Sequence, residues 1–228
     1  MLNTVFLIPI DHRGIHGKLF EQYLELQSWC EKNNSKIVTC NGLFLNFARN
    51  FLATGGRGNY DTRPIEAEWL FWIDSDIQFS IEQIDYLHRI DPKHKFVTGW
   101  YKSDYSDSAM VGKWDEDYFR ENLHMPFLSG DFMEKKAKDS PSKLIKVDWC
   151  GFGFTKVHRS IYEEMEYPYY PLNPVEIKGC KGVNGDKIDV RDMSFEDVSF
   201  CNNCYATTGI KPLVVPKLRV GHLKSFFV

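Results

Sequence analysis

The chain opens with short apolar runs that alternate with stretches of helical periodicity. Residues 4–8 form an apolar run that ends at Pro9, a pattern typical of a strand buried on both faces of a parallel sheet. Apolar residues at helical spacing follow, before the turn-forming pair Asn33-Asn34. The alternation predicts strands at residues 4–8, 36–40, 69–73 and 96–101, with helices over 19–30, 43–54 and 80–87, the last opened by a Ser80/Gln83 capping box.

The pattern is weaker between residues 102 and 146, where charged and Ser/Asp-rich stretches dominate. We interpret the charged run 134–138 as a solvated loop or hairpin without a functional role. Residues 168–192 are rich in Pro, Gly and Asn, and we expect a long loop there. Further elements are predicted at 145–149, 158–165, 194–209, 213–215 and 218–220, with Ser194 capping the helix that closes at Gly209.

Size and composition favour one soluble α/β domain. The chain has 228 residues, of which 43% are hydrophobic, enough for one large core. Its 28 basic and 31 acidic residues are mixed along the chain, which argues against nucleic acid as a partner. The apolar start lacks the features of a signal peptide, and no apolar run is long enough to cross a bilayer. We therefore expect a cytoplasmic protein, with reduced cysteines.

Two carboxylates directly follow the most apolar predicted strand. They belong to Asp74-Ser75-Asp76, and ligands of open α/β sheets collect outside the carboxyl ends of strands. With a bend at Ser75, both carboxylates can turn toward one hard cation such as Mg²⁺ or Mn²⁺, which also bridges to diphosphate oxygens. The alternative is that the acids only end the strand and cap the next helix, since Asp-x-Asp alone is a weak pattern.

Later residues add further candidate chemistry. The acids Glu196 and Asp197 open a predicted helix, a position that the helix dipole ordinarily explains, but Asp197 is also a candidate general base toward an acceptor hydroxyl. His222 is a candidate metal ligand, because imidazole suits Mn²⁺, although a lone histidine is more often a surface or core residue. Arg49 lies in an otherwise apolar helix and is either a surface residue or a clamp on a phosphate or base.

The spacing Cys201-x-x-Cys204 is interpreted as part of the core. A structural zinc site needs two more ligands at matched spacing, and a thioredoxin-like pair belongs at a helix N-terminus. Both cysteines instead fall inside a predicted helix, on or near its buried face.

Several stretches, taken in order, resemble the GT-A fold glycosyltransferases, especially the small single-domain enzymes of bacteria, phages and large DNA viruses. The resemblance spans nearly the whole chain and rests on VFLIPI at residues 5–10, WLFWIDSDI at 69–77, VTGWY at 97–101, WCGFGF at 149–154, FEDVSF at 195–200 and VGH at 220–222. It implies a Rossmann-like, mostly parallel sheet flanked by helices in a single domain over residues 1–228, with a nucleotide-sugar-binding half at 1–101 and an acceptor-binding, catalytic half at 102–228.

The resemblance also implies roles for individual residues. On the donor side it places Pro9, Ile10 and Asp11 in the nucleotide pocket and makes Asp74 and Asp76 the Asp-x-Asp metal motif. On the acceptor side it makes the turn from Gly151 to Gly153 the place where backbone approaches the donor sugar and acceptor. It further matches Glu196 and Asp197 to the acidic pair that includes the base in inverting members, and His222 to a histidine that binds the metal in some members.

The function implied is transfer of a sugar, by a hexosyltransferase-type enzyme, from a UDP- or GDP-sugar to a glycan or other hydroxyl acceptor with Mn²⁺ or Mg²⁺. Asp197 as base gives inversion, and a retaining course is favoured if no carboxylate reaches the acceptor face. A sugar nucleotidyltransferase is an alternative, but residues 9–14 do not supply its Gly-rich phosphate loop. A glycoside hydrolase needs two carboxylates and no metal, and a non-catalytic carbohydrate-binding protein on the same fold is a further alternative.

Overall fold

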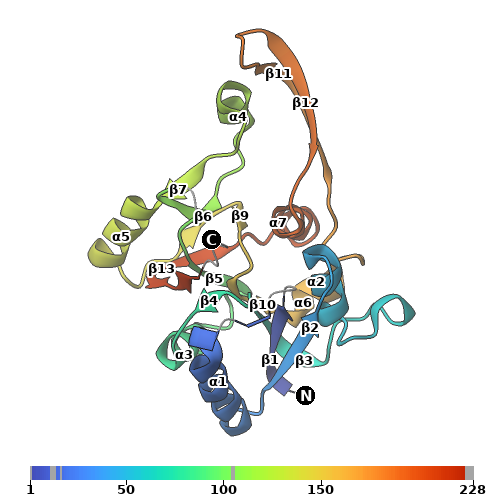
Figure 1. The fold of residues 1–228 in the computed structure, drawn as a ribbon, viewed down its shortest axis with the longest axis vertical. Coiled ribbons are helices and arrows are strands. Elements are labelled where there is room, and N and C mark those ends of the chain that lie inside the picture. Colours follow the sequence, from blue (N-terminus) through green and yellow to red (C-terminus); the bar gives the residue numbers. More distant parts are fainter. Residues whose placement is uncertain (1, 11–13, 16, 104–105, 224–228) are drawn as a thin grey trace.

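A computed structural model describes residues 2–10, 14–15, 17–103 and 106–223. Its centre is a seven-stranded sheet with the strand order β2-β1-β3-β10-β5-β13-β8 (Figure 1). Strands β2, β1 and β3 are mutually parallel, as are β5 and β13, whereas β10 and β8 run antiparallel to their neighbours. The predicted α/β fold with a mostly parallel sheet is confirmed. The strands span Leu2–Ile10 (β1), Lys36–Asn41 (β2), Ala67–Ile73 (β3), Phe96–Trp100 (β5), Ile145–Lys146 (β8), Phe154–His158 (β10) and Leu213–Arg219 (β13).

The central strands are apolar on both faces because both faces are covered. In β3, Leu70 and Trp72 belong to one buried cluster, whereas Phe71 and Ile73 belong to the other, as the alternation of side chains along a strand requires. One face packs against α1 (Phe20–Lys32) and α3 (Ile81–His88), and the other packs against α2 (Leu45–Ala53), α6 (Arg159–Glu164) and α7 (Glu196–Thr208). The predicted capping box at the start of α3 is present.

Smaller elements complete the architecture. A three-stranded sheet contains β6 (Ser108–Gly112), β7 (Phe127–Ser129) and β9 (Trp149–Cys150), and β4 (Ile77–Gln78) pairs with β14 (Gly221–His222). The 3-10 helices are η1 (Gly17–Leu19) and η2 (Gly58–Tyr60), and α4 spans Glu116–Asn122. Within the described ranges no helix is long and apolar enough to cross a membrane. Each of the six cysteines is free, and Cys201 and Cys204 are buried inside α7 as predicted.

The charged run at residues 134–138 is helical, so the predicted loop or hairpin is wrong. It lies in α5 (Gly130–Asp139). The hydroxyl of Ser129 caps this helix by accepting a hydrogen bond from the backbone NH of Phe132, and Met133 is buried in the core. With so few apolar residues the helix depends on its cap and on one buried anchor, which a search for periodicity does not detect.

The segment predicted as a long loop contains a projecting hairpin. Its strands are β11 (Pro174–Lys181) and β12 (Lys187–Met193), which extend away from the central sheet beside α4 (Figure 1). Alternating apolar residues on either side of Asn184-Gly185 are the signal that the prediction missed. Ser194 is not the cap of α7, because its hydroxyl lies 2.6 Å from that of Ser199 and Phe195 takes the N-cap position.

Candidate active site

A cavity of about 580 Å³ lies where β1 and β3 end, beside the first turns of α2 and α7. Most residues predicted for the site lie in its walls: Pro9, Ile10, Arg49, Asp74, Ser75, Asp76, Glu196, Asp197 and His222. Asp11, also predicted, lies outside the described residues. The sequence thus predicted residues from both halves of the chain that the fold brings together in one cavity.

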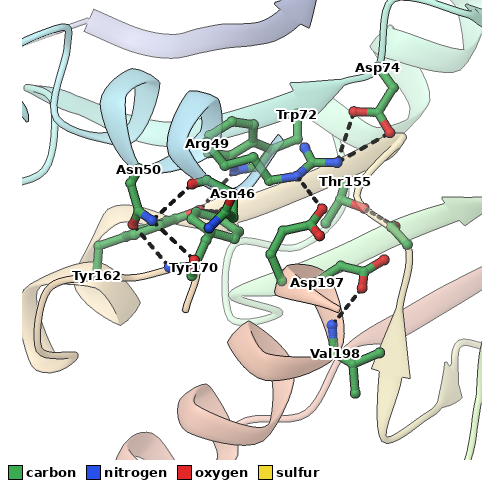
Figure 2. Close-up of polar contacts among 12 residues, drawn as sticks. Asn46, Arg49, Asn50, Trp72, Asp74, Thr155, Tyr162, Tyr170, Asp197 and Val198 are labelled. Carbon is green, nitrogen blue, oxygen red and sulfur yellow. Dashed lines mark hydrogen bonds and ion pairs between the residues drawn. The ribbon is translucent and has the colours of Figure 1, made fainter. Parts of the chain in front are cut away.

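Arg49 joins the donor-side and acceptor-side acids (Figure 2). Its Nη2 donates to both carboxylate oxygens of Asp74 at 2.9 and 3.2 Å, and its Nε donates to Oε1 of Glu196 at 3.2 Å. The side chain is 2% exposed, which excludes the surface alternative. Burial lowers the pKa of Arg49, but the charges of Asp74 and Glu196 raise it more, so the guanidinium stays charged. The ion pairs with these two carboxylates offset the cost of removing the guanidinium from water.

The helix that carries Arg49 is itself fixed by polar contacts. The side-chain amide of Asn50 donates to the backbone oxygens of Asn46 and Tyr170, and its Oδ1 accepts from the backbone NH of Tyr170 at 3.0 Å (Figure 2). The guanidinium lies 5.5 Å from the ring centre of Trp72 and 5.6 Å from that of Phe152. Arg49 therefore has little freedom to move independently of β3 and α7.

Asp74 and Asp76 follow the same strand but have different partners. The backbone NH of Ile77 donates to the carbonyl of Asp74, closing a turn around Ser75. This turn directs Asp74 to Arg49, whereas Oδ2 of Asp76 lies 3.1 Å from Nε2 of His222. Burial raises the pKa of Asp74, and the charge of Arg49 opposes the rise.

His222 reaches Asp76 because β14 pairs antiparallel with β4, so that His222 lies opposite Ile77. Burial lowers the pKa of His222, but the hydrogen bond with Asp76 and the charges of Asp76 and Asp74 outweigh this effect and raise it. The backbone of Lys102 contributes to the same rise. Among the described residues, no group of three or more His, Cys, Asp or Glu side chains is arranged to hold a metal ion.

Asp197 lies at the start of α7, partly buried in the cavity wall. Its Oδ1 accepts a hydrogen bond from the backbone NH of Val198 at 2.7 Å. Burial and the neighbouring charge of Glu196 raise the pKa of Asp197 to about 7, although Arg49 opposes the shift. A carboxylate with this pKa can accept a proton near neutral pH.

The glycines of the 151–153 turn lie beneath the cavity wall. A Cβ on Gly151 would clash with the Tyr101 hydroxyl, and one on Gly153 would lie 2.8 Å from Cε1 of the same ring. Tyr101 and Phe152 line the cavity, whereas the two glycines do not. The absence of a side chain at both glycines makes room for the Tyr101 ring. The close approach of a ligand to their backbone stays a prediction.

Sequence reasoning missed the apolar part of the wall. Besides Ser103, the cavity is also lined by Leu43, Phe44, Leu45, Tyr101, Met110, Phe152 and Phe195. Position gives a usable signal for two of them: Phe44 follows β2 at the same sheet edge, and Phe195 directly precedes the two acids of α7.

No protein-family model and no curated protein sequence matches the chain. Among solved structures, it is similar to A197 from STIV (TM-score 0.54, 15% identity), with 98% of this chain and 87% of that one covered. It is also similar to GalNAc-T7 with UDP, GalNAc and Mn²⁺ (TM-score 0.53, 12% identity), with 99% of this chain covered but only 44% of that one. At this identity the likeness concerns the fold alone: the chain has a GT-A-like fold, and it spans less than half of the GalNAc-T7 chain.

Proposed function

We propose that the protein is a glycosyltransferase that moves a sugar from a nucleoside-diphosphate sugar to an acceptor hydroxyl. One observation carries the proposal: a single cavity at the carboxyl edge of a GT-A-like sheet contains the Asp74/Asp76 pair and the Glu196/Asp197 pair, linked through Arg49. The cavity volume lies within the range of about 300–1,000 Å³ typical of ligand sites. The UDP, GalNAc and Mn²⁺ named for GalNAc-T7 support a nucleotide-sugar donor and a metal.

The charge of the cavity supports a requirement for a divalent cation. Four carboxylates line it, and Arg49 is the one Arg or Lys among its described lining residues. A diphosphate entering this site would meet excess negative charge unless a cation entered with it.

Asp76 and His222 are the residues that fit a Mn²⁺ or Mg²⁺ ion. Their side chains are 36% and 23% exposed and present adjacent oxygen and nitrogen donors at the cavity. Asp74 is held by Arg49 and would support the site from the neighbouring position. A bound divalent cation would supply positive charge to the diphosphate as it leaves.

Asp197 is the proposed base. As the acceptor oxygen bonds to the anomeric carbon of the sugar, the acceptor proton passes to the Asp197 carboxylate, and the bond from that carbon to the diphosphate oxygen breaks. Attack opposite to the leaving group inverts the anomeric centre. Pro9 and Ile10, at the end of β1, would then contact the nucleotide, since ligands of such sheets bind outside the carboxyl ends of the strands.

The test is to incubate the protein with UDP- and GDP-sugars and a set of simple glycosides as acceptors, with and without Mn²⁺, and to measure released nucleoside diphosphate. We expect Mn²⁺-dependent release in the wild type and its loss in Asp76→Asn. Asp197→Asn should lose turnover but keep nucleotide affinity. Asp139→Asn, an exposed acid of α5 outside the cavity, is the matched control and should behave as the wild type.

The same assay separates the alternatives. A sugar nucleotidyltransferase would release pyrophosphate from a nucleoside triphosphate and a sugar 1-phosphate and would leave nucleotide sugars intact. Full activity in Asp76→Asn, or in Asp197→Asn, would overturn the role proposed for that residue. Absence of diphosphate release from every donor would overturn the proposed function.

A further inference from the structure

The two helices that border the cavity both begin with an exposed phenylalanine. Phe44 is the N-cap of α2 and Phe195 is the N-cap of α7, and neither helix has a side-chain cap hydrogen bond. Helix N-caps favour Ser, Thr, Asp and Asn, because their side chains accept hydrogen bonds from free backbone NH groups. Phenylalanine at this position therefore forgoes a stabilising interaction.

Packing does not explain these two phenylalanines either. Phe44 is 82% exposed and Phe195 is 76% exposed, so both rings leave most of their apolar surface in water. Both line the cavity that contains Asp197. Positions that violate local preferences without a gain in the fold are expected at functional sites, and exposed apolar groups at a cavity point to a ligand with an apolar part.

The surroundings of Phe195 indicate which ligand this is. Phe195 lines the same cavity as Asp197, the proposed base, so a group resting on the Phe195 ring would share that cavity with the reacting hydroxyl. Leu43 and Leu45, both more than 40% exposed, add aliphatic surface to the same cavity. This part of the wall offers hydrocarbon contacts, which suit an apolar ring or chain better than a strongly hydrated group.

We propose that Phe195 binds the acceptor and selects acceptors that carry an apolar group beside the hydroxyl to be glycosylated. The inference rests on the proposed function and adds the acceptor class to it. Burial of the Phe195 ring against such a group provides affinity that a methyl glycoside cannot gain.

The test compares binding of phenyl and methyl β-D-glucopyranoside to the protein with UDP and Mn²⁺ present, by calorimetric titration. We expect the phenyl glycoside to bind roughly tenfold to hundredfold more tightly, as full burial of a large apolar side chain implies. In Phe195→Ser this preference should fall to within about threefold, while Phe195→Tyr retains it. Phe47→Ser removes a ring of α2 that is 61% exposed but lies outside the cavity lining, and should leave the preference unchanged.

Stability and donor binding separate this role from others. Serine is a favoured N-cap, so Phe195→Ser should melt at the wild-type temperature or above it, and its UDP affinity should be unchanged. Equal binding of the two glycosides by the wild type, no binding of either, or an unchanged preference in Phe195→Ser would overturn the inference. If the donor is turned over while the preference is absent, this inference alone fails. If the wild type does not turn over any donor, the proposed function fails, and the acceptor assignment fails with it.

Discussion

Replacing Arg49 by methionine tests whether one buried guanidinium holds the candidate site together. Methionine keeps much of the side-chain volume but leaves Asp74 and Glu196 without their ion-pair partner. Glu196 is 9% exposed and Asp74 is 23% exposed. Breaking a buried ion pair costs about 3–5 kcal/mol, and the partial exposure of Asp74 places the expected loss of unfolding free energy near the lower end, about 3 kcal/mol.

The loss should depend on pH. Without Arg49, the folded-state pKa of Asp74 rises further above its unfolded value, because burial already raises it and the opposing cation is gone. A group whose pKa is raised on folding destabilises the folded state increasingly as pH rises through that pKa. The difference between Arg49→Met and the wild type should therefore be largest at pH 8 and become smaller toward pH 5.

The measurement is urea unfolding followed by tryptophan fluorescence at pH 5.5 and pH 8. Arg89→Met is the matched control, since Arg89 is 79% exposed and lies 3.8 Å from Asp85; it should cost less than about 1 kcal/mol at either pH. Arg49→Lys should be intermediate, because a lysine keeps the charge but cannot donate to two carboxylates in the fork geometry. A loss below about 1 kcal/mol in Arg49→Met, or one independent of pH, would refute the reasoning.

Three further predictions concern the cavity. Turnover should rise with pH through about 7 as Asp197 loses its proton; a rate that is constant between pH 5.5 and 8.5 would contradict its role as base. His222→Gln should lower the affinity for Mn²⁺ in the presence of UDP by about tenfold or more, measured by thermal shift against metal concentration; unchanged affinity would exclude His222 as a ligand. Gly153→Ala should cost about 1–3 kcal/mol by overpacking against Tyr101, measured by urea unfolding; a neutral effect would show that the ring can move.

The central strands were predictable because their signal is local. Residues 69–73 are apolar without alternation, and a strand in the middle of a helix-covered sheet has this pattern. The Ser80/Gln83 capping box is equally local, since both partners lie within four residues. The position of Asp74 and Asp76 at a sheet edge followed from the end of the same strand.

The parts that sequence reasoning missed depend on distant partners. The hairpin of β11 and β12 packs beside α4, and α5 is anchored by the burial of Met133; neither contact is visible in the periodicity of the segment. The burial of Arg49 depends on Glu196, which lies 147 positions away in the sequence. A charged residue in an apolar helix has the same local pattern whether its partner is a distant carboxylate or water.

The Arg49 contacts also change the meaning of the Asp-x-Asp pattern. From the sequence, Asp74 and Asp76 are both candidate ligands of one cation. In the structure, Asp74 is tied through Arg49 to Glu196 at the start of α7, and Asp76 is tied to His222. The first link fixes the end of β3 relative to the helix that carries Asp197, and the second leaves two donors partly exposed at the cavity.

Because reacting groups must be held within a fraction of an ångström to react efficiently, Arg49 is expected to contribute to turnover by positioning these two sides of the cavity, without contacting the sugar. A conservative Arg49→Lys variant that folds fully should therefore lose turnover more than nucleotide affinity.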